Sequence, residues 1–153
     1  MSYEVLLTFH IVAAVLWVGG AVAMILLALR ITGARANSQM ADFAANIEWL
    51  GKFYFTPLSL MTLLFGILLV QQMDSVTVSD FFVQYGLTAI VITIAVGAGF
   101  LGPQSGKLSQ LIAAKGAEAP EAQALLGRIL TVARLDALML LSVVAMMALK
   151  PFS

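Results

Sequence analysis

One histidine stands inside an apolar stretch of this sequence. His10 is the only histidine in 153 residues, and it lies within TFHIVAAVLWVGG. Burying an unpaired polar side chain is costly, so an ionisable residue in a membrane helix is a candidate functional group. An imidazole at this place either ligates a metal such as haem iron or hydrogen-bonds to a carbonyl or hydroxyl group of a neighbouring helix. The sequence leaves both interpretations open.

Two stripes of side chains could complete a metal site around His10. Helical spacing from His10 leads to Trp17 on the same face. Near the other end of the chain, one helical face carries a carboxylate, two thioethers and an ammonium: Asp136, Met139, Met147 and Lys150. If His10 ligates iron, a sixth ligand could come from a methionine such as Met147, from Lys150 or from His10 of a second copy. The structural alternatives are packing for the methionines and an interfacial anchor for Lys150.

The amino-acid composition excludes some kinds of site and leaves others open. There is no cysteine, which excludes thiolate metal sites, disulfides and cysteine nucleophiles. Methionine thioethers also bind Cu(I), so a copper conduit is a further interpretation. The segment GAGFLG at 97–102 matches the dinucleotide fingerprint by letter, but it lies in an apolar run rather than in a strand-turn-helix unit. We expect its small residues to let another helix approach closely instead.

The elements that position these residues must be membrane helices. Hydrophobic residues make up 61% of the chain and charged ones 10%, against roughly 45–50% and about 25% in soluble domains. Four apolar runs, at 5–29, 53–73, 81–106 and 129–149, reach the roughly 20 residues that a bilayer core requires of a helix. The last carries Arg134 and Asp136 near its start. We predict an all-α fold, a transmembrane four-helix bundle that forms a single domain over 1–153.

The distribution of charge predicts the orientation of this bundle. Basic residues gather in two connections: Arg30, Arg35 and Lys52 lie between the first two runs, and Lys107, Lys115 and Arg128 between the last two. The connection between runs two and three has two aspartates and no basic residue. Because cytoplasmic loops are enriched in Lys and Arg, we predict an N-out, C-out topology. The first run lacks a basic leader and is too long for a signal-peptide core, so we expect a retained anchor.

The connections themselves contain helical patterns. Met40, Phe43, Ile47 and Leu50 recur at helical spacing, which predicts a short interfacial helix before helix two. Pro57 then falls about one turn into helix two, where we expect a tolerated bend. A helical extension should follow Pro103, and Pro120 suits the first position of the last helix.

The chain also resembles a known family group. TFHIVAAVLWVGG, TPLSLMTLLFGILLV and ARLDALMLLSVVAMMALKPF are similar to the first, second and last helices of the HemJ-type protoporphyrinogen oxidases, of the copper-resistance D membrane domain and of related uncharacterised bacterial membrane proteins. The resemblance implies a four-helix bundle that contains b-type haem and can form a dimer. It matches His10 to the family's N-terminal histidine, Trp17 to its tryptophan and Lys150 to its closing lysine.

The chain departs from the oxidases at several positions. They carry a further histidine after the first helix, where this chain reads ALRITGARA, and another in the third, where it reads GLTAIVITIAVGAGF. Their asparagine-glutamate pair in the last helix is replaced by Leu135 and Asp136. These departures favour the uncharacterised branch over the oxidases.

Three functional hypotheses follow. The first is a haem b protein of the membrane, with His10, Trp17, Met147 and Lys150 as cofactor-binding candidates, acting as an electron carrier or as a haem-dependent oxidoreductase of protoporphyrinogen-oxidase type. The second is a cofactor-free structural or assembly subunit, and the third is the Cu(I) conduit. Formal net charge is zero and no basic patch exists, so nucleic acid is not an expected partner. We expect the lipid bilayer of a bacterial inner membrane as the surroundings, with a second copy or another membrane protein as partner.

Overall fold

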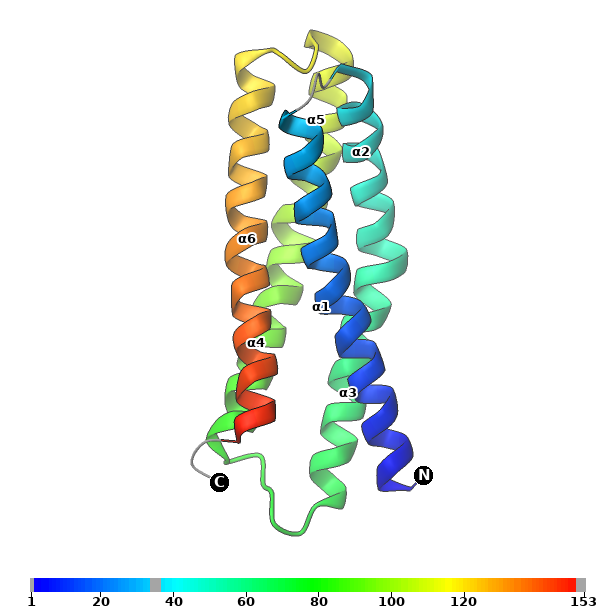
Figure 1. The fold of residues 1–153 in the computed structure, drawn as a ribbon, viewed down its shortest axis with the longest axis vertical. Helices are drawn as coiled ribbons and strands as arrows, with labels where there is room; N and C mark the ends of the chain where they lie inside the picture. The colour runs from blue at the N-terminus through cyan, green and yellow to red at the C-terminus, as the bar shows by residue number, and fades with distance from the viewer. Residues whose placement is uncertain (1, 34–36, 151–153) are drawn as a thin grey trace.

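The computed structural model describes residues 2–33 and 37–150, which form four long helical rods and no strand (Figure 1). The first rod is α1 (Tyr3–Gly33), and the fourth is α6 (Pro120–Leu149). The second rod joins α2 (Asn37–Leu50), the π-helix η1 (Gly51–Phe55) and α3 (Thr56–Gln72), and the third joins α4 (Phe81–Val96), the π-helix η2 (Gly97–Leu101) and α5 (Gly102–Lys115). The predicted all-α four-helix bundle is confirmed. Arg35 and the proline that follows Lys150 lie outside the described residues.

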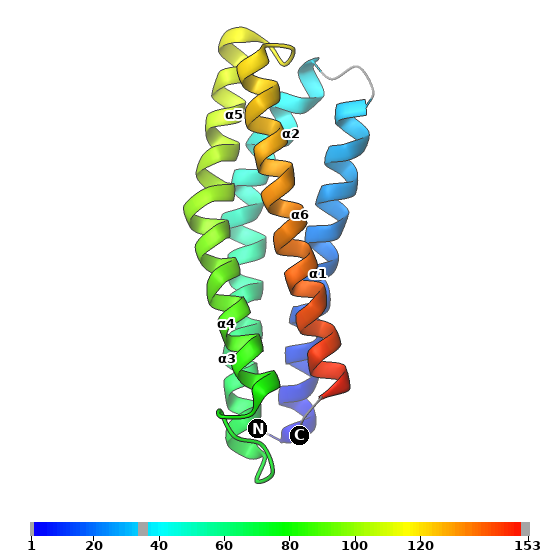
Figure 2. The ribbon, with the colours of Figure 1, turned by 90° about the vertical axis from the view of Figure 1, so that its left-hand side faces the viewer.

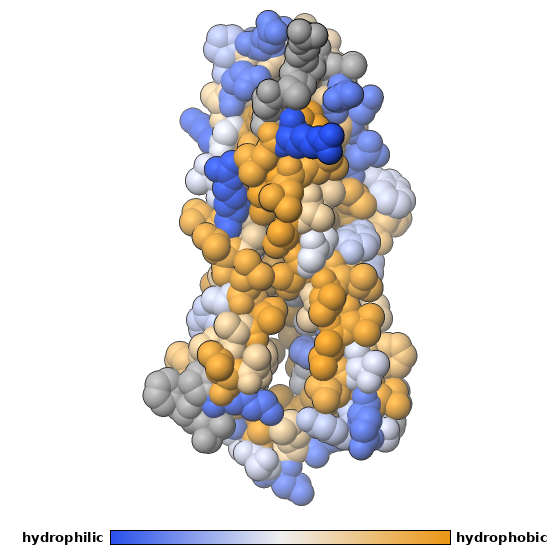
Figure 3. Space-filling view, in the orientation of Figure 1, coloured by the Kyte–Doolittle hydropathy of each residue, from blue (hydrophilic) through white to orange (hydrophobic). Residues whose placement is uncertain are grey.

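Each rod contains a stretch long and apolar enough to cross a membrane. These stretches are Tyr3–Ile31, Asp42–Gln72, Phe81–Lys115 and Pro120–Leu149. Val15, Leu26, Val91 and Leu138 are 61–63% exposed, and Figure 3 shows apolar side chains covering the middle and lower parts of one face. Apolar side chains at that exposure suit a lipid solvent, so the chain is a small integral membrane protein.

The two ends of the bundle differ in structure. The start of α1 and the end of α6 lie together at one end, here called the terminal end, where the connection from α3 to α4 also lies (Figure 1). At the opposite end, the head, α2 and α5 stand upright beside the first half of α6 (Figure 2). The head has a core of its own, made by buried residues of these three helices and of the connection from α5 to α6: Met40, Ala44, Leu108, Ile112, Ala117, Ala122, Leu126 and Ile129.

The helix predicted before span two therefore exists, but it continues the second rod rather than lying across the bundle. Met40 and Ala44 of α2 are buried against Leu108 and Ile112 of α5. Two amphipathic helices that extend past the apolar region bury their apolar faces against each other and so do not need the membrane interface. The extension predicted after Pro103 is α5, and the start predicted at Pro120 is confirmed.

Each π-helix ends two residues before a proline. In η1 the backbone N–H of Thr56 donates to the carbonyl of Gly51, and in η2 that of Gly102 donates to Gly97. Proline has no N–H to donate, and the wider turn rearranges the hydrogen bonds around Pro57 and the proline that follows Gly102 without breaking the rod. A π-helix thus precedes Pro57, the position where a tolerated bend was expected.

The glycines of η2 do not serve the purpose predicted for them. A Cβ atom added at Gly97 or Gly99 would meet nothing within 4 Å, and at Gly102 it would approach only the carbonyl of Gly97 in the same rod. Close approach of another helix at these glycines is therefore wrong within the described part of the chain. They belong to the wider π-helical turn instead.

Candidate functional site

His10 is held between α1 and α3 by a hydrogen bond to the backbone. Its Nδ1 atom lies 2.9 Å from the carbonyl oxygen of Thr62. A carbonyl can only accept, so Nδ1 carries the proton and donates, and Nε2 keeps the lone pair. No hydrogen bond to Nε2 occurs among the described residues. The imidazole is thus paired, as one interpretation of the sequence required, and its tautomer is the one that would leave Nε2 available to a metal.

A glycine makes room for this ring. A Cβ atom at Gly66 would lie 3.1 Å from Cε1 of His10 and 3.3 Å from Nδ1. Both separations are tighter than ordinary van der Waals contact. The absence of a side chain at Gly66 therefore lets the imidazole lie against α3, within reach of the carbonyl one turn earlier.

The same arrangement recurs in the opposite direction nearer the middle of the bundle. The hydroxyl of Tyr54 donates to the carbonyl oxygen of Leu16 on α1 at 2.8 Å. A Cβ atom at Gly20 would lie 2.7 Å from Cε1 of Tyr54, so a glycine again admits the ring. Each of the two antiparallel rods thus sends one ring to the other's backbone, and these two bonds fix the register between α1 and the second rod.

The other predicted cofactor residues are spread along the bundle. Trp17 lies two helical turns from His10 and is buried, 5% exposed, in a cluster with Val18, Ile90 and Leu140. Met147 packs beside Phe82 and Val83 and contacts the position where Gly86 lacks a side chain. Lys150 caps α6 in the left-handed conformation, and its N–H donates to the carbonyl of Met146 at 2.9 Å. His10, Met147 and Lys150 share the terminal end, as antiparallel spans one and four require.

A large cavity lies on the head side of the Trp17 cluster. Its volume is about 640 Å³, within the range of roughly 300–1,000 Å³ typical of small-molecule sites. All four rods line it, and both π-helices contribute, with Gly51 and Phe55 on one side and Gly97 and Leu101 on the other. Trp17 lies on its wall, whereas His10 does not. π-Helical turns are frequent at functional sites because they change the shape of a helix wall locally.

The cavity gathers polar atoms that have no partner. Thr93 Oγ1, Ser105 Oγ and Asp136 Oδ1 are buried and have no partner in good hydrogen-bond geometry among the described residues, and the Thr93 hydroxyl lies close enough to the Asp136 carboxylate to interact with it. All three residues line the cavity. Leaving such a group unsatisfied costs about 1–3 kcal/mol, so the arrangement is suited to a molecule that supplies the missing partners.

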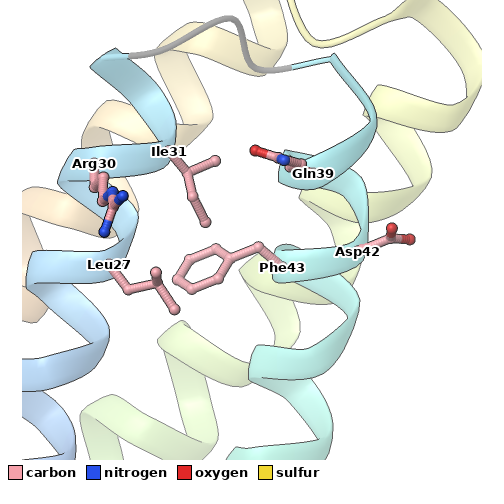
Figure 4. A pocket seen from close by; sticks show the side chains of 6 residues that line it. All are labelled: Leu27, Arg30, Ile31, Gln39, Asp42 and Phe43. Carbon is pink, nitrogen blue, oxygen red and sulfur yellow. The ribbon is translucent and has the colours of Figure 1, made fainter.

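A second pocket opens beside this cavity at the head. It has a volume of about 580 Å³ and lies between α1 and α2. Figure 4 shows Leu27, Ile31 and Phe43 turned toward one another across it, while the carboxylate of Asp42 points away. Phe43 lines both the pocket and the cavity. Phe43 is therefore shared by the surface pocket and the cavity.

Sequence reasoning singled out Asp136 but missed its neighbours. Thr93 and Ser105 are ordinary residues in an apolar run, and only the register of α4 and α5 against α6 brings them to the same cavity. The signal in the sequence was the Asp136 carboxylate inside an apolar span, because such a group needs polar neighbours. Within residues 2–33 and 37–150 no three of His, Asp and Glu gather as a metal site; this does not bear on thioether ligands.

Comparison with known proteins finds no match to this chain. No protein-family model, no curated protein and no solved structure matches the chain. The geometry of His10, Asp136 and the cavity therefore has to carry the functional argument.

Proposed function

We propose that this small integral membrane protein binds haem b through Nε2 of His10 and has a redox role. The hydrogen bond from His10 Nδ1 to the Thr62 carbonyl is the observation that supports this function most directly. Metal-bound histidines commonly donate their other ring N–H to a carbonyl, because this bond fixes the tautomer and orients the ring. The imidazole is held in that way before any metal is present.

The residues around His10 are compatible with a haem at the terminal end. One histidine suffices for five-coordinate haem iron. Figure 3 shows the surface hollowed between the lower parts of α6 and α1, at the end of the bundle where α1 begins. Met147 and Lys150 are the candidates for a further ligand within the chain, and His10 of a second copy would serve in a homo-oligomer. Haem would supply one-electron chemistry, while the chain supplies the ligand and excludes water through the buried Trp17 cluster.

The experiment is an absorption spectrum of protein purified in mild detergent, oxidised and then reduced. We expect a Soret band that shifts on reduction, and we expect His10→Ala to lose it while the protein stays monodisperse and helical. The matched control is Tyr54→Phe, which removes the other cross-rod hydrogen bond but no metal ligand, and should keep the pigment. Full pigment in His10→Ala would overturn the assignment of His10.

A cofactor-free structural or assembly subunit is the second candidate function. It is supported by the fact that His10 already has a hydrogen-bond partner and so needs no metal to be tolerated in the bundle. On this proposal the purified protein is colourless and folded, and His10→Ala weakens it only as Tyr54→Phe does. Equal loss of stability in the two variants, with no pigment in the wild type, would favour this function over haem binding.

A further inference from the structure

The cavity at the head side of Trp17 is not used by a haem on His10. The helix register gives the positions of its polar side chains relative to Trp17. Trp17 packs against Ile90 of α4 and Leu140 of α6, and this apolar layer is the floor of the cavity. Thr93 is one helical turn above Ile90, and Asp136 is one turn above Leu140. The Thr93 hydroxyl and the Asp136 carboxylate therefore lie together on the head side of the Trp17 ring.

The two polar atoms can be satisfied by a single hydroxyl group. Asp136 Oδ1 needs a donor, and the Thr93 hydroxyl can donate or accept. A hydroxyl bound between them would donate to Asp136 and accept from Thr93. Thr93 is only 6% exposed and the Oδ1 atom of Asp136 is buried, so a neutral group can enter without the desolvation cost of a charged one.

The rest of the cavity is suited to an apolar body. Beyond Asp136, most of the wall toward the head is apolar, with Ser105 as a polar exception; the apolar side chains are those of Met24, Ile25, Ala28, Phe43, Leu126 and Ile129. Glu48 and Lys52, which also line it, pair with each other at 2.9 Å. Water alone would fill the volume poorly, since roughly 20 molecules at about 30 Å³ each would face mostly apolar walls. A lipid-soluble molecule replaces that water favourably.

The surface pocket of Figure 4 lies beside this cavity at the head. That pocket is lined by Leu27, Ile31 and Phe43, with Arg30 and Gln39 as polar neighbours. Phe43 is a wall of both spaces, so the pocket and the cavity adjoin at this side chain.

We propose that this cavity binds a lipid-soluble alcohol or phenol, with its hydroxyl between Asp136 and Thr93 and its apolar body extending to Phe43. The site is independent of haem binding at His10. It differs from a generic apolar groove because it requires a hydroxyl at one end. A methyl ether of the same shape would leave Asp136 without a donor and should bind worse.

The test uses Trp17 as a reporter on the cavity wall. In the Trp49→Phe background, which removes the exposed second tryptophan, the full-length protein is reconstituted in phosphatidylcholine vesicles and titrated with bromododecylphenol. Bromine quenches indole fluorescence on contact. We expect saturable quenching, and we expect the corresponding bromododecyl anisole to bind about 10-fold more weakly, the cost of a lost hydrogen bond to a charged group.

Three pairs of variants separate the site from the fold. Asp136→Asn and Thr93→Val should each weaken phenol binding several-fold, whereas Glu118→Gln and Thr131→Val, at exposed positions off the cavity, should not. Gly97→Leu should abolish binding because it fills the cavity, while Gly99→Leu should not, since Gly99 does not line it; a Cβ atom is free of contact at both positions. Melting temperatures of all variants show whether each is folded.

The outcomes decide the proposal either way. Saturable quenching that depends on Gly97, Asp136 and the hydroxyl supports it. Quenching that rises without saturation, or equal affinity for the phenol and the anisole, overturns it. Displacement by dodecylammonium at lower concentration than by dodecanol would overturn the ligand class in favour of a cation.

Discussion

Replacing Gly66 with alanine should separate the orientation of His10 from the stability of the bundle. The new Cβ would lie 3.1 Å from His10 Cε1 and 3.3 Å from Nδ1, so the ring must shift by a few tenths of an ångström. The bond to Thr62, now 2.9 Å long, is then lengthened or lost. Losing it costs about 0.5–1.5 kcal/mol, while alanine in a helix interior gains roughly 0.5–1 kcal/mol over glycine.

The two terms nearly cancel, so the free energy of unfolding should change by less than roughly 1 kcal/mol. The ring orientation, by contrast, should be lost. His10 is the only histidine, so nitrogen NMR of histidine-labelled protein reports one side chain without assignment. We expect a single Nδ1–H tautomer in the wild type and a mixture in Gly66→Ala.

The control is Gly127→Ala, where a Cβ meets nothing within 4 Å. It should stabilise the protein slightly and leave the tautomer unchanged. Haem affinity, if the proposed function holds, should fall about 10–100-fold in Gly66→Ala, as it does when the partner of a metal-bound histidine is removed. A wild-type tautomer in Gly66→Ala would refute the reasoning, because the ring would not then depend on the missing Cβ.

Three further changes test other parts of the structure. Tyr54→Phe should lower the free energy of unfolding by about 0.5–1.5 kcal/mol by removing one cross-rod hydrogen bond, measured by denaturant titration in detergent; no change would mean that the bond is not formed. Gly86→Ala should change the free energy of unfolding little, because its Cβ meets the terminal methyl group of the flexible Met147 side chain, which can move away; a loss as large as that of Met147→Ala would contradict this. Because the chain has no cysteine, single cysteines at Val78 and Glu118 can report orientation, and only the first should react with an impermeant reagent from outside.

The sequence predicts the spans well because bilayer thickness limits them. The run at 5–29 corresponds to the stretch Tyr3–Ile31, and the start at Pro120 follows from the missing N–H of proline, which the first turn of a helix does not need. The placement of α2 could not be predicted, because its apolar face fits either a membrane surface or another helix. Only the apolar face of α5, brought alongside by the fold, decides between the two.

The details of the site are harder to predict from the sequence than the spans are. The partner of His10 is a main-chain carbonyl, and every residue has one, so no residue type marks it in advance. It is specified by the register of α1 on α3 and by Gly66. The π-helices had a weak signal, since in both rods a glycine stands six residues before a proline, at Gly51 and Gly97. All four rods line the cavity, so no local sequence pattern predicts it.

The pairing of the rods has a consequence for how the protein is made. α1 is joined to the second rod by the His10 and Tyr54 hydrogen bonds, and α4 is joined to α6 by the bond between Tyr85 and Ser142 at 2.6 Å. The first two spans can thus close on each other in the membrane while the last two are still being synthesised. The cavity arises only when the two finished halves dock, so the order of translation is also the order in which the binding surface is completed.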